Sequence, residues 1–178
     1  MARARIEGRL ENADLPDAKE VITSALDAAM HEAVLLLERR VKLNTPIGVT
    51  ESARGSIGSE VRRGVAAGRG VPVVRGFVGS PLAHVLVLDR GRRPGAPPPP
   101  SDALELWVRR RMGVTDIAEA QRVAFLVARA IGRRGTKALH IFDRAVRESQ
   151  STLDRIFDRA GVAIAVRVER EKGKRGRK

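Results

Sequence analysis

Residues 56–79 read SIGSEVRRGVAAGRGVPVVRGFVG, and this stretch decides the fold class of the 178-residue chain. In both 56–65 and 73–79, β-branched residues are interleaved with polar residues and glycine, a pattern that predicts strands. The glycine-rich segment between them is typical of a hairpin turn. AHVLVLD, residues 83–89, also shows a pattern typical of a strand. We therefore expect a meander of three antiparallel strands.

Helical patterns stand on both sides of these strands. Apolar residues recur at helical spacing over residues 14–44, with Asp14 as a capping residue and Pro16 in the first turn. Three more helices are predicted over 101–112, from Asp116 onward, and over 138–160, where Gly161 would end the last one.

VAIAVRV, residues 162–168, reads as a final strand. The expected class is α+β, with a long N-terminal helix, an antiparallel strand meander, three further helices and a C-terminal strand. Residues 1–168 are expected to form a single domain, and residues 169–178 a basic, flexible tail.

The composition argues against several classes of function. The chain has no cysteine, which excludes disulfides, thiolate nucleophiles and zinc–thiolate sites. Aromatic residues are only 3%, which disfavours a base-stacking platform for single-stranded nucleic acid. No HExxH, GxSxG or Walker A motif occurs, and the three histidines are far apart in sequence. We expect no enzymatic activity, no cofactor and no metal site. Without a secretory signal or a span of about 18 apolar residues, the default location is the cytoplasm.

A net charge of +13 is the strongest compositional signal, and it predicts a polyanion or an acidic protein surface as partner. The alternative is that arginine merely keeps the protein soluble. Candidate contacts to DNA or to partner proteins fall in two clusters, one at the end of the predicted helix 101–112 and one at the C-terminus. They are Arg109, Arg110, Arg111, Lys172, Lys174, Arg175, Arg177 and Lys178.

Several stretches, in an unbroken order over roughly residues 25–150, resemble the head–tail joining proteins of long-tailed bacteriophages. This is the neck or tail-completion family typified by gene product ten of lambda-like phages. The matching stretches are TPIGVTESARGSI after the long helix, VLVLDRGRRPGAPPPP, SDALELWVRRRMG, and EAQRVAFLVARAIGRRGTKALHIFDRAV. No single motif is strong, but their order is fairly specific.

The resemblance implies a structural virion protein at the head–tail junction, assembled in the host cytoplasm. It implies a homo-oligomeric ring around the DNA exit channel, with six copies favoured over twelve. Its neighbours would be neck, head-closure and tail-terminator or tail-tube proteins, and double-stranded DNA would pass through without sequence reading. The alternative from another class is a basic nucleic-acid-binding protein without enzymatic activity.

The proline run Pro97–Pro100 is predicted to form a stiff polyproline II rod of about 3 Å per residue. It would set a fixed offset between the sheet and the helix that carries Trp107, or it would cover a sheet edge. We expect Trp107 to pack in the core, because the helix has a single apolar stripe. The alternative is an exposed anchor for a neighbouring subunit.

Overall fold

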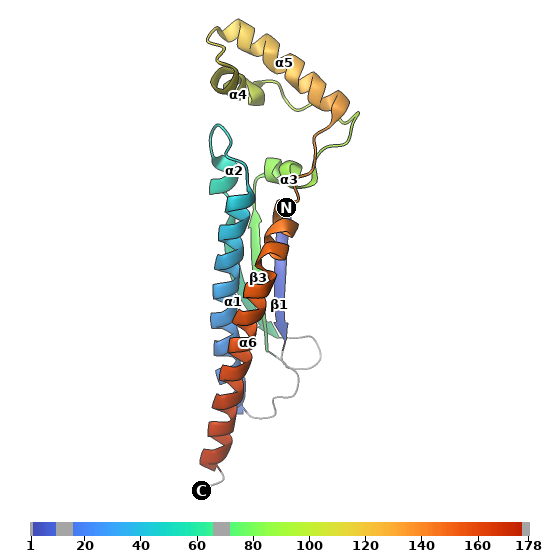
Figure 1. The fold of residues 1–178 in the computed structure, drawn as a ribbon. Helices are drawn as coiled ribbons and strands as arrows, with labels where there is room; N and C mark the ends of the chain where they lie inside the picture. Colours follow the sequence, from blue (N-terminus) through green and yellow to red (C-terminus); the bar gives the residue numbers. More distant parts are fainter. Residues whose placement is uncertain (1, 10–15, 66–71, 176–178) are drawn as a thin grey trace. The chain divides into compact units, whose positions relative to one another are not determined.

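The computed structural model describes residues 2–9, 16–65 and 72–175 (Figure 1). The predicted α+β class is confirmed, with a long N-terminal helix, an antiparallel strand pair and several further helices. In chain order the elements are β1 (Ala2–Arg9), α1 (Pro16–Asn44), α2 (Ser52–Gly55), β2 (Gly58–Val65), β3 (Pro72–Ser80), α3 (Ala83–Arg90), α4 (Asp102–Met112), α5 (Ile117–Arg134) and α6 (Ile141–Arg175).

The described residues fall into two compact units, a division that the sequence analysis did not anticipate. The helical unit contains residues 45–56 and 81–141, and so includes α2, α3, α4 and α5. The sheet unit contains residues 3–9, 16–44, 57–65, 72–80 and 142–175. It holds the three strands together with the two longest helices, α1 and α6.

The sheet has three strands in the order β1-β3-β2. β2 and β3 pair antiparallel from Gly58 opposite Gly79 to Val65 opposite Pro72, as the two predicted strands require. Helix α1 lies against β3 at Gly76, where an added Cβ would overlap Val34 and lie 2.8 Å from the Met30 sulfur. The glycine is therefore what lets the helix approach the sheet closely.

Helices α1 and α6 run antiparallel, side by side (Figure 1). Ala29 of α1 packs with Ile156 and Ala160 of α6 in a small apolar cluster. Polar contacts hold the same pairing further along: Arg159 Nη2 lies 2.7 Å from Glu32 Oε1, and Arg144 Nη2 donates to Asn44 Oδ1 at 2.8 Å. Small residues at the contact let the two helices pack closely along their apolar stripes.

Two predicted strands are wrong. Residues 83–89 form helix α3, in which Val85 is fully buried and its neighbours are only partly covered or exposed. Residues 162–168 lie inside α6, so the C-terminal strand does not exist and Gly161 is a helix-interior residue. The reason is that Ile164 continues the buried stripe of Ile156 and Ala160 at helical spacing.

The third strand of the sheet is instead β1, from a segment to which the sequence analysis assigned no element. The proposed cap Asp14 lies outside the described residues, as does the proposed hairpin tip, residues 66–72, except for Pro72, which begins β3.

Candidate interaction surfaces

Helices α4 and α5 form a two-helix hairpin in the helical unit, and its core is small. Val108 of α4 packs with Ala120 and Ala124 of α5, all of them at most 1% exposed, and further apolar residues close around them. The buried stripe of α5 consists of Ala120, Ala124, Ala128 and Gly132 at four-residue spacing. Such small residues let α4 and the preceding chain approach the α5 backbone.

The predicted ends of these helices are confirmed at two positions. Asp116 is the N-cap of α5, and its Oδ1 accepts a hydrogen bond from the Glu119 backbone N–H at 2.7 Å. Gly113 ends α4 in the left-handed conformation, at φ 72°.

The proline-rich segment is fastened to the end of α5. Arg92 and Thr136 exchange backbone hydrogen bonds of 3.0 and 3.1 Å, and Gly95 N–H donates to Gly132 O at 2.8 Å. A Cβ on Gly132 would lie 3.2 Å from Pro98 Cβ. Pro98 therefore packs on a glycine of α5, which fixes the start of the proline run to this helix; the predicted spacing role relative to the sheet stays a prediction.

Gly135 makes the turn after α5 that brings Thr136 to Arg92. Its φ is +70°, and an added Cβ would overlap Arg92 O and lie 2.9 Å from Pro94 N. A glycine is needed here on both counts, conformation and space.

The three candidate arginines at the end of α4 are all exposed, and the structure gives them different surroundings. Arg110 Nη1 donates to Val49 O at 3.0 Å, and Arg111 Nη2 makes a longer contact of 3.4 Å to Ile47 O. Both carbonyls belong to the segment before α2, in the same unit. These partners are neutral, so the positive charge of the cluster is not cancelled by them.

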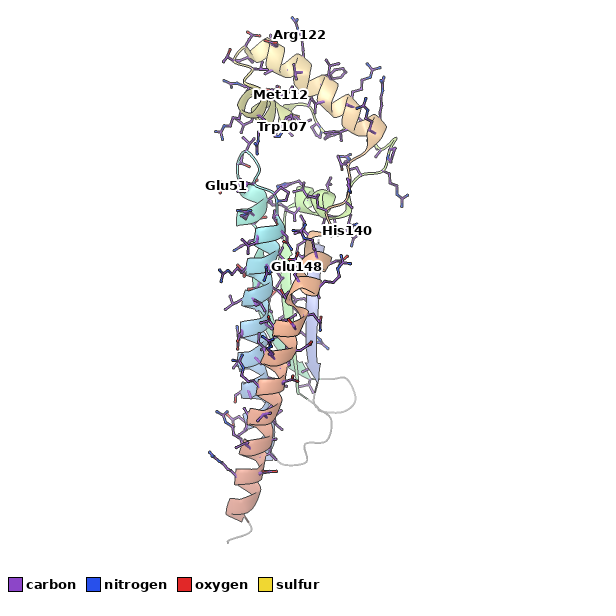
Figure 2. The ribbon with its side chains drawn as sticks, viewed as in Figure 1. Glu51, Trp107, Met112, Arg122, His140 and Glu148 are labelled. Carbon is purple, nitrogen blue, oxygen red and sulfur yellow. The ribbon has the colours of Figure 1, made fainter. Side chains whose placement is uncertain are left out.

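Trp107 is not a core residue. Its side chain, labelled on α4 in Figure 2, is 40% exposed. Val108 is fully buried and supplies the α4 contact to α5. The predicted core role for Trp107 is wrong because Leu104 and Val108, one turn apart, line the side of α4 that packs on α5, and Trp107 is not part of that cluster. Leu106 is 41% and Met112 54% exposed, so α4 presents three large apolar side chains.

On α5, Phe125 is 58% exposed and Leu126 is 60% exposed. Both lie outside the buried stripe of small residues on this helix. Three exposed arginines lie at helical spacing on the same side of α5 as Leu126: Arg122, which Figure 2 labels, Arg129 and Arg133. Among the described residues, none of these three arginines has a carboxylate partner. We call the five residues the α5 outer stripe.

Arginines of the sheet unit are often neutralised, in contrast. Arg63 pairs with Asp27, Arg62 with Glu60, Arg144 with Glu148 and Arg159 with Glu32. Residues 81–141 of the helical unit carry eleven Lys or Arg against five Asp or Glu. Basic residues therefore outnumber acidic ones by six in this part of the helical unit.

Two carboxyl groups on α1 are tied to β2 and have altered acidity. Hydrogen bonding from Arg63 lowers the pKa of Asp27, with burial acting in the opposite direction. Burial raises the pKa of Glu38, but hydrogen bonds from Lys42 and Ser59 outweigh it and lower the pKa overall. Both contacts serve the packing of α1 on the sheet.

The C-terminal candidate cluster is brought onto a helix. Helix α6 continues to Arg175, so the backbone of Lys172, Lys174 and Arg175 is helical, while Arg177 and Lys178 lie outside the described residues. Residues 169–175, which were expected to begin the flexible tail, are therefore the last residues of α6.

Across residues 2–9, 16–65 and 72–175, no helix is long and apolar enough to cross a membrane, and no three His, Asp or Glu residues are grouped so as to hold a metal ion. No family model, curated protein or solved structure matches the chain.

Proposed function

We propose that the protein is a structural component of the neck of a long-tailed bacteriophage, acting in tail completion or head–tail connection. It would form a ring around the DNA exit channel, with six copies favoured, and contact neck, head-closure and tail-terminator or tail-tube neighbours. Its place would be the head–tail junction of the virion, after assembly in the host cytoplasm.

The proposal starts from the ordered resemblance over residues 25–150. Its support in the fold is the helical unit, where two of the resembling stretches meet. GRRPGAPPPP and IGRRGT are hydrogen-bonded to each other through Arg92, Thr136, Gly95 and Gly132. Residues of two resembling stretches thus hold the two ends of the α4–α5 segment together.

The single observation that carries a binding role is the surface of the α4–α5 hairpin. It combines exposed large apolar side chains, such as Trp107 and Phe125, with arginines that have no carboxylate partner among the described residues. A surface of this kind suits contacts to other proteins and to DNA phosphates.

The test is to locate the protein in particles. Antibody to the chain should label purified virions at the neck, and an amber mutant of the gene should accumulate filled heads and finished tails that do not join. Adding purified protein to that lysate should restore infectious particles. Particles that lack the protein, or a mutant that joins heads to tails normally, would refute the proposal and favour the nucleic-acid-binding alternative.

A further inference from the structure

The α5 outer stripe has a counterpart of opposite charge on α6, in the other unit. Asp158, Val162, Val166 and Glu169 follow one another at spacings of four, four and three residues, so they share one side of the helix. Val162 is 66% exposed and Val166 is 43% exposed, and both carboxylates are exposed. We call these four residues the α6 outer stripe. It faces away from the Ile156, Ala160 and Ile164 stripe that packs inward.

The two stripes also match in length. Arg122 to Arg133 and Asp158 to Glu169 each span eleven residue steps, about 16 Å at the rise of an α-helix. In both stripes the apolar pair lies between charged residues. Laying one helix along the other, in either direction, brings Arg122 and Arg133 to the two carboxylates. Phe125 and Leu126 then meet Val162 in the parallel arrangement or Val166 in the antiparallel one, and Arg129 lies opposite the other valine.

Like stripes cannot pair in this way. Two α5 outer stripes would oppose arginine to arginine, and two α6 outer stripes would oppose carboxylate to carboxylate, which is unfavourable. Charge complementarity therefore selects an α5–α6 contact. Because each copy carries both stripes, such contacts can join successive copies head to tail.

We propose that the α5 outer stripe of one copy binds the α6 outer stripe of the next copy, and that this contact joins successive subunits. The ring that it would close rests on the proposed neck function, whereas the pairwise contact does not. A single helix pair buries less than a standard interface of about 1,600 Å² in total, so the contact in free solution is weak and depends on concentration.

The test uses charge reversal in the full chain, followed by sedimentation at low salt from about 10 to 500 µM protein. One variant is Arg122→Glu with Arg133→Glu, and the other is Asp158→Lys with Glu169→Lys. Wild type should form concentration-dependent oligomers. Each variant alone should have its dissociation constant raised tenfold or so, because it now opposes like charges.

Mixing the two variants is the decisive step. Every contact between an α5-reversed and an α6-reversed copy opposes unlike charges again, so the equimolar mixture should recover association. The recovery also shows that both variants are folded. The matched control, Arg39→Glu with Arg90→Glu, makes the same charge change at exposed arginines outside the stripes and should associate like wild type.

Three results would overturn the inference: a wild type that stays monomeric throughout, an α6-reversed variant that associates like wild type, or a mixture that fails to recover. None of them bears on whether the protein is found at the neck of virions. A failure of this contact is therefore distinguishable from a failure of the proposed function.

Discussion

The guanidinium of Arg63 holds the carboxylate of Asp27 through two parallel hydrogen bonds, Nε to Oδ1 at 2.8 Å and Nη2 to Oδ2 at 2.7 Å. The pair joins β2 to α1 across 36 positions of sequence. Bidentate geometry of this kind is the strongest form of arginine–carboxylate contact. It fixes how the hairpin lies on the long helix.

Acid should weaken the sheet unit through this pair and through Glu38. Both carboxyl groups have folded-state pKa values below their ordinary values of 3.8 and 4.5. A lowered pKa gives stability that is present above the ordinary value and is lost as the pH falls through the folded value. The thermal midpoint should therefore fall as the pH is lowered from about 5 to about 3, and it should fall less in the Asp27→Asn, Glu38→Gln double variant.

Scanning calorimetry across that range measures the slope of the thermal midpoint against pH for the wild type and the double variant. Asp154→Asn, which removes an exposed carboxylate on α6, serves as the control. Equal slopes in all three proteins would contradict the assignment.

Gly76→Val should destabilise the protein strongly. The new side chain would collide with Val34 and Met30, so α1 would have to move off β3. Overpacking of this type costs about 1–3 kcal/mol or more. The control is Gly58→Val on the paired strand, where nothing lies within 4 Å of an added Cβ and the β-branched residue suits a strand. Urea denaturation should separate the two variants; similar midpoints would show that the close approach at Gly76 is unimportant.

Trp107→Ala should leave the protein soluble and folded. The indole is 40% exposed, so its removal should cost about 1 kcal/mol, well below the 3–5 kcal/mol typical of a fully buried tryptophan. Val108→Ala, next to it, should cost roughly 2 kcal/mol because that side chain is fully buried against α5. Denaturant titration of both variants checks the order. If Trp107→Ala proved the more damaging, the indole would have a packing role that its exposure does not suggest.

Replacing Arg109, Arg110 and Arg111 by alanine should weaken binding to double-stranded DNA equally for all sequences. Phosphate contacts carry no sequence information, and each one lost reduces the salt dependence of the binding constant by roughly one unit of slope. Fluorescence anisotropy over a range of salt concentrations measures this slope. A triple variant at Arg39, Arg147 and Arg155, exposed arginines of the sheet unit, controls for the lost net charge. An unchanged slope in the Arg109–Arg111 variant would remove this cluster from the DNA contacts.

The parts of the fold that could be predicted are those with a local cause. The α1 helix follows from apolar residues at helical spacing over nearly thirty positions, and the start of α5 follows from the pairing of Asp116 with Glu119. The β2–β3 hairpin follows from β-branched residues around glycine-rich turns. In each case the signal is long enough, or specific enough, to be read without knowing the neighbours.

The failures share a different cause, since tertiary contacts decided them. VAIAVRV is short and rich in valine, which favours a strand. It is helical because Ile164 continues the buried stripe of α6 after Ala160, and this stripe packs against α1. The alternation ARARIEGR, residues 2–9, was a readable strand signal that the basic side chains obscured. Trp107 was placed inside because its helix has a single apolar stripe. The small α4–α5 core consists instead of valine, leucine and alanine side chains.

The hydrogen-bonded pair Arg92 and Thr136 has an evolutionary consequence. The chain leaves toward α4 after Arg92 and returns from α5 at Thr136, and these two residues are paired. The segment between them can therefore be lengthened, shortened or exchanged without altering where its ends meet. Recombination could in this way bring in a hairpin with new surface residues, while the rest of the protein stays unchanged. Adaptation to a different neighbour would then need only one exchange of a short coding segment.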